Sequence, residues 1–467
     1  MNDIISFLKS EFYNLVFSFL EFFENFIWEY LGVPAVVILG ITLTIQSRGF
    51  QLRNLPTVLR RFFSYFFMKT EGKGVHPIKA FFACVGGCVG VGNIVGICTA
   101  IQIGGPGALF WIWITAIIGM VVKYAEVYLG VKYRKDHGDG TYSGGPMFFL
   151  KRATAQSWIP VTVCLLLCIY GVEVYQFRVI TESLSENFHL HPGFVSAALI
   201  VCVIFAGSGG VARVGHIASY LIPVFVFLFL GMGFWVLAHH LHQIPIVLSQ
   251  VFSQAFTGNS AVGGAFGSAI MITVSQGVRR GCYTGDLGVG YASVIHSESE
   301  VESAEKQASL VIVDVFLDTF VICTMSVMMI LTTGIWQQPM EAGMLIQTVL
   351  RDYFPGMDYF MPLFLFLLGY STISAYFVVG LKCAEHVSKK WGVLMFNVYA
   401  VLALVLSVFF DTSQAQSVMA IAGGLLLLIN SWGIWTLRKE ISYAIQEEVI
   451  LSTISGQEEE GISAPIS

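Results

Sequence analysis

Long apolar stretches follow one another along most of this 467-residue chain, and they limit what it can fold into. An α-helix needs about 20 predominantly apolar residues to cross the hydrocarbon core of a bilayer. About eleven stretches come near that length: 28–47, 78–103, 107–131, 158–184, 194–207, 213–240, 260–277, 307–333, 358–381, 391–410 and 415–437. Charged residues make up only 12% of the chain, about half the share of a typical soluble protein. The sequence therefore predicts an all-α polytopic membrane protein, surrounded by membrane lipid, with about eleven transmembrane helices.

Basic residues predict how these helices are oriented, because Lys and Arg collect in short cytoplasmic loops. They lie at every second boundary between the apolar stretches, from the segment 48–79 to Arg438 and Lys439. This alternation predicts a multi-pass protein of the cytoplasmic (inner) membrane, with the N-terminus outside and the C-terminus inside. The formal net charge is −5, which speaks against a nucleic-acid partner. The oligomeric state stays open.

Glycine interrupts two of the stretches. The run GGCVGVGNIVG (86–96) lies in the middle of 78–103, and the run GGAFGS (263–268) lies within 260–277. In a helix, glycine is less favourable than alanine by about 1 kcal/mol per residue, so both runs predict helix breaks. Each break opens a set of five spans, and an odd number gives the two sets opposite orientations. Such a 5+5 inverted repeat is the plan of many secondary transporters.

This plan divides the chain into four segments. Residues 1–77 are expected to hold an interfacial helix (Met1–Phe26), an extra transmembrane helix and a basic cytoplasmic loop. Residues 78–240 form the first repeat, and residues 241–437 form the second repeat with the loop before it. Residues 438–467 form an acidic cytoplasmic tail.

A helix that breaks at mid-membrane offers two kinds of binding group. Carbonyl oxygens at the end of the first half, near Val89, can hold a cation, and N–H groups at the start of the second half attract an anion. Asn93 is expected to cap the restarted helix. Sodium and an amino-acid carboxylate would be a natural pair of ligands. Close helix packing through small residues is the alternative explanation of these glycines.

Polar residues inside other spans extend the predicted site. Leu368, Thr372 and Tyr376 follow at i, i+4 and i+8 on one helix face beside Ser371, and such oxygen ligands suit hard cations. Ionisable groups inside a span usually face a cavity or a partner. Within 158–184, Gln176 is the candidate for binding substrate, while Glu173 and Arg178 form an ion pair or act in transport. A larger set is interpreted as packing pairs or gating contacts: Lys123, Glu126, Asp314 and Asp318. No HExxH, GxSxG, Walker-type or CxxC motif indicates an enzyme.

Several blocks of the sequence resemble the alanine or glycine:cation symporters, the sodium:alanine symporter family. The most specific block is GVGNIVGICTAIQIGGPGALFWIWITAIIGMVVKYAEVYLGVKYR (90–134), and TYSGGPMFFL (141–150) and GVRRGCYTGDLG (277–288) support it. The resemblance implies a leucine-transporter-like fold in which sodium drives the uptake of a small neutral amino acid, typically alanine or glycine. The chain differs from the family's usual residues at Glu173, Arg178 and Tyr376, so the amino acid itself stays open.

The resemblance, together with the two glycine breaks, gives the expected site residues. Substrate is expected at Gly90, Gly92, Asn93, Gln176, Gly264, Gly267, Ser268, Thr372 and Tyr376. Sodium, the co-transported ion and the only cofactor expected, is assigned to Gly86, Val89, Leu368, Ser371 and Thr372. Two alternatives remain. One is a proton-coupled amino-acid carrier in which Glu173 or Asp286 titrates, and the other is an amino-acid sensor of the same fold that no longer transports.

Overall fold

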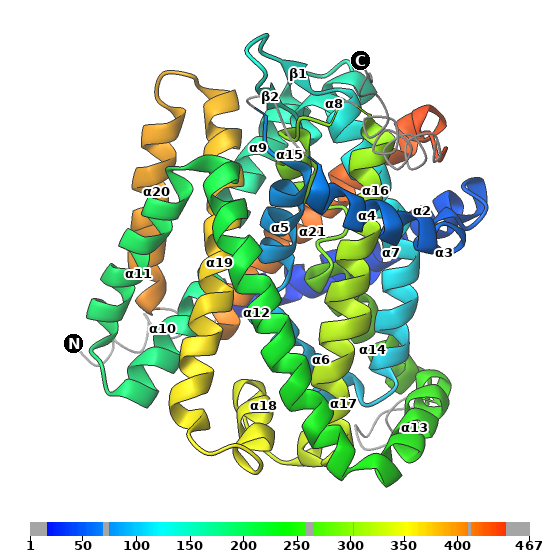
Figure 1. Ribbon diagram of the computed structural model, residues 1–467, viewed down its shortest axis with the longest axis vertical. Coiled ribbons are helices and arrows are strands. Elements are labelled where there is room, and N and C mark those ends of the chain that lie inside the picture. The colour runs from blue at the N-terminus through cyan, green and yellow to red at the C-terminus, as the bar shows by residue number, and fades with distance from the viewer. Residues whose placement is uncertain (1–15, 69–73, 258–265, 302, 410–411, 445–467) are drawn as a thin grey trace, which may run out of the picture.

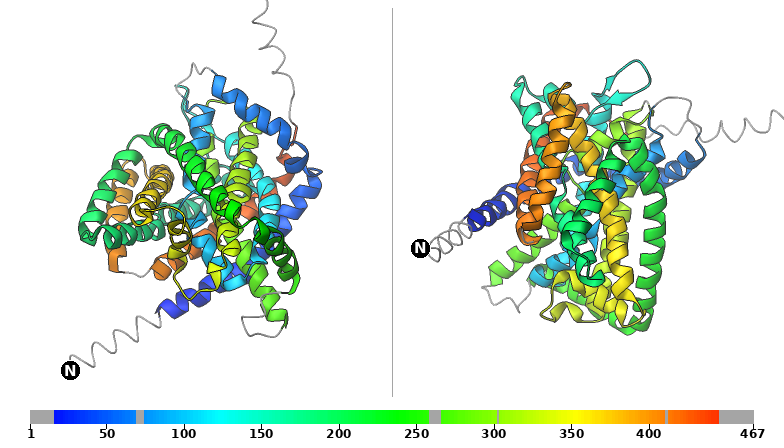
Figure 2. Two further views of the ribbon diagram at one scale, coloured as in Figure 1. Left: turned by 60° about the horizontal axis from the view of Figure 1, so that its bottom comes forward. Right: turned by 90° about the vertical axis from the view of Figure 1, so that its left-hand side faces the viewer.

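The computed structural model describes residues 16–68, 74–257, 266–301, 303–409 and 412–444. Within these residues the chain is helical apart from loops and one short antiparallel hairpin. The hairpin pairs β1 (Lys135–Asp136) with β2 (Tyr142–Ser143), with Lys135 opposite Ser143. The helices stand side by side as a bundle in all the views (Figure 1, Figure 2). The predicted polytopic, essentially all-helical architecture is confirmed.

Seven helices in the described part of the chain are long and apolar enough to cross a membrane. They are Val16–Gln46, α7 (Ala108–Lys132), Trp158–Phe188, α12 (Gly210–His239), Ala304–Thr332, α19 (Met357–Val387) and Gln414–Glu440. The pair α5 (Pro77–Cys88) and Val91–Gly104 raises the number to eight when it counts as one bent span. Two shorter apolar helices, α11 (Pro192–Gly207) and α20 (Gly392–Leu406), fall on two more predicted stretches.

Some of the long helices contain several elements, and shorter elements connect them. The components of long helices are η1 (Phe26–Gly32), α2 (Val33–Gln46), α9 (Trp158–Tyr170), α10 (Val174–Phe188), α16 (Ala304–Val315), η6 (Phe316–Cys323), α17 (Thr324–Thr332), α21 (Thr412–Leu437) and η9 (Arg438–Glu440). The remaining elements are α3 (Phe50–Arg53), α4 (Leu55–Ser64), η2 (Tyr65–Phe67), η3 (Val91–Asn93), α6 (Gly96–Gly104), α8 (Pro146–Ala153), η4 (Leu241–Gln243), α13 (Ile244–Thr257), α14 (Phe266–Thr284), α15 (Tyr291–Ser297), η7 (Ile335–Gln337), α18 (Ala342–Arg351) and η8 (Ser407–Phe409).

The N-terminal helix differs from its prediction. Val16–Gln46 is one helix, so the described part of Met1–Phe26 is continuous with the first span instead of forming a separate interfacial helix; residues 1–15 lie outside the described residues. Trp28 fixes this helix to the bundle by donating from Nε1 to the Ala420 carbonyl at 2.9 Å. Figure 2 shows the start of this helix projecting from the bundle.

Burial separates central helices from peripheral ones. Most of α7, Ala304–Thr332 and α19 is enclosed by other helices, whereas α12 turns large apolar side chains such as Phe227 and Phe234 outward. Outward-facing apolar side chains are favourable only where lipid replaces water. The protein is therefore a multi-pass membrane protein whose central helices are shielded from lipid.

Candidate functional site

The first predicted break is confirmed. Helix α5 ends at Cys88, the backbone at Val89 and Gly90 is extended, and α6 begins at Gly96, so that the two halves are bent by 55°. Figure 1 shows α5 and α6 as the upper and lower halves of this span. The last carbonyls of α5 and the first N–H groups of α6 therefore lack helical partners at mid-span.

The second break was predicted at residues 263–268, of which 263–265 lie outside the described residues and 266–268 are helical. Helix α14 runs unbroken from Phe266 to Thr284, and the chain leaves helical geometry at residues 285–290 before α15 begins. Left-handed φ angles occur there at Asp286, Gly288 and Gly290, and glycine adopts this backbone at little cost. Glycines within α14 are helical, and the missing side chain lets a neighbouring helix pack closely. A Cβ on Gly277 would lie 2.5 Å from Trp111 Cβ.

Two predicted substrate residues of the described chain lie far from the break at residues 285–290. Gly264 lies outside the described residues, whereas Gly267 and Ser268 lie in the first turn described for α14. Because a helix rises 1.5 Å per residue, Gly267 is about 25 Å from Thr284 along the helix axis. The structure therefore does not place Gly267 and Ser268 with the other predicted site residues.

A small cavity of about 50 Å³ lies between the two breaks. Its lining contains the predicted residues Gly92, Asn93, Gln176 and Tyr376. The other lining residues were not predicted as binding residues: Gly87, Cys88, Tyr170, Glu173, Tyr175, Arg280, Tyr283, Thr284, Gln416 and Met419. Arg280 and Thr284 belong to the block 277–288 that supported the family resemblance, and this block could have indicated them as site residues.

Gly90 and Thr372 lie behind the cavity wall. A Cβ on Gly90 would be 2.6 Å from both Gln176 Oε1 and Thr372 Oγ1, so only glycine fits between these side chains. Gln176 Oε1 also accepts from the Val91 N–H at 3.2 Å, and its amide is hydrogen-bonded to the Glu173 carboxylate. Gln176 thus joins the first break to Glu173, in addition to facing the cavity.

Asn93 has a different local role from the predicted one. Its Oδ1 accepts from the Gly90 N–H at 3.0 Å and so caps η3, whereas Val95 occupies the position before α6. Its Nδ2 donates to Asp318 Oδ1 at 2.5 Å, and its carbonyl accepts from Ser326 Oγ at 2.8 Å. Asn93 therefore connects the broken helix to η6 and α17.

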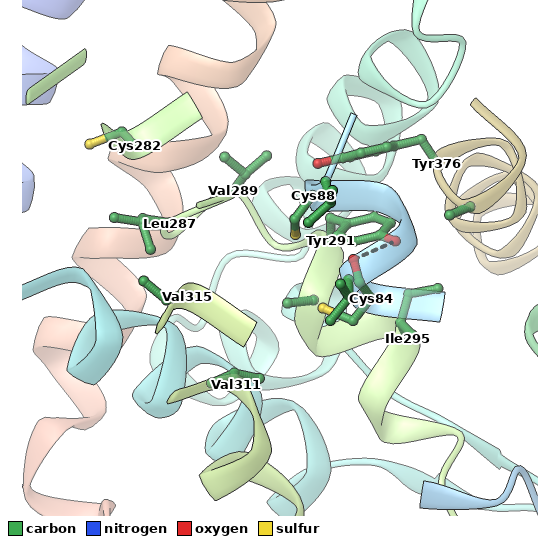
Figure 3. Packing of buried hydrophobic residues seen from close by; sticks show 14 of the residues in the cluster. Cys84, Cys88, Cys282, Leu287, Val289, Tyr291, Ile295, Val311, Val315 and Tyr376 are labelled. Atoms are coloured by element: carbon green, nitrogen blue, oxygen red, sulfur yellow. Dashed lines mark hydrogen bonds between the residues drawn. The ribbon is translucent and has the colours of Figure 1, made fainter. Parts of the chain in front are cut away.

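Three tyrosines form one wall of the cavity region. The rings of Tyr291 and Tyr376 are stacked with centroids 4.0 Å apart, and Tyr170 meets Tyr376 edge to face. The Tyr376 hydroxyl donates to Asp286 Oδ1 at 2.9 Å, and the Tyr291 hydroxyl donates to the Ala83 carbonyl at 2.8 Å. Figure 3 shows Tyr376 and Tyr291 next to Cys88 at the end of α5. The wall thus connects α19, α15 and the first break.

The predicted sodium residues of α5 and α19 lie together. Thr372 Oγ1 donates to the Gly86 carbonyl at 3.0 Å and also lies 3.3 Å from the Leu368 carbonyl. Ser371 Oγ would be 2.5 Å from a Cβ on Gly86, and this buried oxygen has no hydrogen-bond partner among the described residues. Val89 follows α5 in extended backbone. These groups are hard oxygen donors next to a helix end, which fits an alkali cation.

Buried charges next to the cavity are paired across helices. Lys123 of α7 contacts Asp314 Oδ2 at 2.6 Å, the Gly285 carbonyl at 2.9 Å and Cys88 Sγ at 3.2 Å. The Glu126 carboxylate accepts from the N–H groups of Gly290 and Ser293, both at 3.1 Å. The interpretation of these residues as packing or gating contacts agrees with their position at the breaks.

Among the ion pairs of the described residues, none joins Glu173 to Arg178. Arg178 pairs with Glu182 one turn along α10, whereas Glu173 precedes α10 in left-handed backbone, with φ 51° and ψ 47°. Residues 171–173 separate α9 from α10, so this span is interrupted as well. A buried non-glycine residue in left-handed backbone is unusual and suggests a functional constraint.

Comparisons with known proteins agree with this architecture. The sequence matches the sodium:alanine symporter family over residues 13–449. It is 30% identical to the uncharacterized transporter YflA of Bacillus subtilis over 78% of this chain and 79% of the relative. It is 27% identical to the sodium/alanine symporter AgcS of Methanococcus maripaludis, over 82% of this chain and 86% of the relative.

Two solved structures share the fold. MhsT in complex with L-phenylalanine gives a TM-score of 0.55 at 15% identity, covering 79% of this chain and 90% of MhsT. A Na⁺-coupled sialic acid symporter gives 0.56 at 11% identity, covering 85% and 86%. The fold is thus leucine-transporter-like. Because the family match spans most of the sequence, this chain belongs to the sodium:alanine symporter family, whose members are cation-coupled amino-acid symporters and not enzymes.

Proposed function

We propose that this protein is a sodium-coupled symporter that imports a small neutral amino acid, of the alanine or glycine class, across the cytoplasmic membrane. The observation that carries the proposal is the position of a small cavity with polar and aromatic lining residues between two helix breaks, next to the oxygen groups of Gly86, Ser371 and Thr372. A cavity of about 50 Å³ suits only the smallest amino acids, because one water already needs about 10–15 Å³.

The mechanism follows from the helix ends. Sodium binds between the end of α5 and α19, where carbonyl and hydroxyl oxygens meet the negative end of a helix dipole. The bound ion favours the arrangement of the first break in which the cavity accepts a zwitterion. Movement of one part of the bundle against the rest then opens the cavity to the cytoplasm. The proposed topology is an eleven-span 5+5 inverted repeat, with the N-terminus outside and the C-terminus inside.

Uptake by purified protein in proteoliposomes tests the function. Radiolabelled glycine, alanine and larger amino acids are offered with an inward sodium gradient, and again with sodium replaced by potassium. Uptake of glycine or alanine that requires the sodium gradient supports the proposal.

The same vesicles separate the alternatives. Uptake that persists without sodium and collapses when the pH gradient is removed would replace sodium coupling by proton coupling; the fully buried Asp286, with one oxygen unpartnered among the described residues, is the candidate proton site. Saturable binding without uptake under either gradient would indicate a sensor.

A further inference from the structure

We propose that Glu173 and Arg280 are two opposite charge receptors in one cavity: Glu173 binds the ammonium group of the substrate, and Arg280 binds its carboxylate. The inference rests on the proposed function and deepens it. It assigns an orientation to the substrate, and it restricts the class of substrate to compact zwitterions that carry both charges.

The burial and the backbone conformation of Glu173 indicate that the fold holds its side chain at the cavity. It is 5% exposed, it lines the cavity, and it sits in left-handed backbone at the interruption between α9 and α10. Glutamate does not adopt this backbone without strain, so the fold holds it there against a local preference. Gln176 is hydrogen-bonded to the carboxylate from the next turn, which fixes its position at the cavity wall.

Arg280 approaches the cavity from α14. Its side chain lies against the first turn of α6, where a Cβ on Gly96 would be only 2.4 Å from a guanidinium nitrogen. Glycine at this position therefore makes room for the guanidinium beside the positive end of α6. Both the helix end and the guanidinium attract an anionic group, and a planar guanidinium suits a carboxylate. This side of the cavity is the place for the substrate carboxylate.

The two charges are not neutralised by each other. Among the described residues, no ion pair joins Glu173 to Arg280, and the Arg280 guanidinium lies 5.9 Å from the centre of the Tyr283 ring. The neighbouring Arg279, by contrast, pairs with Glu24. Buried charges are costly unless they are paired. A ligand that carries both an ammonium and a carboxylate would pair both receptors at once.

Asp286 is the alternative acid for binding the substrate ammonium, but its position does not suit this role. It does not line the cavity, and the Tyr376 hydroxyl stands before it and donates to Oδ1 at 2.9 Å. Glu173, by contrast, lines the cavity, so a bound ammonium can reach its carboxylate directly.

The test measures binding to purified, full-length protein with three probes that differ in charge. Alanine carries both charges, lactate lacks the ammonium, and alaninamide lacks the carboxylate; the last two compete against radiolabelled alanine. We expect E173Q to weaken alanine binding about tenfold or more while the affinity for lactate stays unchanged. R280Q should weaken alanine binding by a similar factor while the affinity for alaninamide stays unchanged.

Control variants keep the test decisive. Glu186 is exposed on the same helix α10, so E186Q should bind all three probes as the parent protein does. E173D keeps the negative charge and should retain more alanine binding than E173Q. This second variant tests the charge even if E173Q folds poorly. If E173Q binds alanine within threefold of the parent protein, the assignment of the charge receptors is overturned, whereas the proposed function is not. Failure of the parent protein and E186Q to bind any small amino acid overturns the proposed function.

Discussion

The Lys123 ammonium lies 2.6 Å from the Asp314 carboxylate, and both side chains are fully buried. The same ammonium reaches Cys88, the last residue of α5, and the Gly285 carbonyl, directly after α14. Cys84, Cys88 and Asp314 have the side-chain types of a metal site, but the ammonium lies among them. A positive charge is favourable at the negative ends of two half-helices. One lysine thus connects both breaks with α16.

Removing Lys123 alone should therefore destabilise the protein strongly. K123M leaves Asp314 as an uncompensated buried charge, which costs about 3–5 kcal/mol. The double variant K123M/D314L removes both charges and should regain most of the stability, as measured by thermal unfolding of the detergent-purified protein. Its uptake should stay low, because the Gly285 carbonyl has lost its donor. A single variant that unfolds at the parent temperature contradicts the role of the pair.

The apolar pattern predicts most of the fold because the bilayer sets the length of each span. The described long and short apolar helices fall on the predicted stretches, and the first break falls on the glycine run 86–96. The second break could not be found by glycine density alone. Helix α14 keeps its glycines helical where they pack against α7, as Gly281 does against Thr115. The break instead needs left-handed backbone, which Asp286 and Gly288 supply.

Thr372 should control sodium dependence. Its hydroxyl lies 3.0 Å from the Gly86 carbonyl and lacks contact with the cavity, so T372V removes a cation ligand and leaves the substrate wall unchanged. We expect the half-saturating sodium concentration for uptake to rise about tenfold, equivalent to about 1.4 kcal/mol. T372S retains the hydroxyl and should remain near the parent value. Altered substrate selectivity at an unaltered sodium requirement would refute this role.

The candidate site is less predictable than the fold, because local sequence does not reveal which distant groups meet. Asn93 and Gln176 were expected to bind substrate, and both line the cavity. Their hydrogen bonds to Asp318 and Val91 depend on tertiary packing between helices far apart in sequence. Arg279 and Arg280 are adjacent basic residues of α14, and only the fold distinguishes them, because it gives Arg279 a partner in Glu24.

Asn93→Ala and Gln176→Ala should each abolish uptake while the protein stays folded. Asn93→Ala removes the cap of η3 and the contact to Asp318, and Gln176→Ala releases the Val91 N–H at the break. Uptake is compared with the amount of protein in the membrane. N397A is the matched control, because the Asn397 amide donates within its own helix, the peripheral α20, to the Val393 carbonyl. Parent-like uptake by both cavity variants would dismiss their assignment to the site.

Two glycine-to-alanine variants should give opposite results. A Cβ on Gly87 would lie 2.0 Å from the Tyr291 hydroxyl, so G87A must displace the ring that stacks on Tyr376. Overpacking of this kind costs about 1–3 kcal/mol, and movement of the tyrosine wall should also reduce uptake.

A Cβ on Gly231 in α12 would have no neighbour within 4 Å. G231A should therefore be neutral or more stable by up to about 1 kcal/mol, since alanine favours helix. Thermal unfolding and uptake of the two purified variants are measured side by side. Equal stability and equal uptake of G87A and G231A would show that the position of the Tyr291 ring does not require glycine at residue 87.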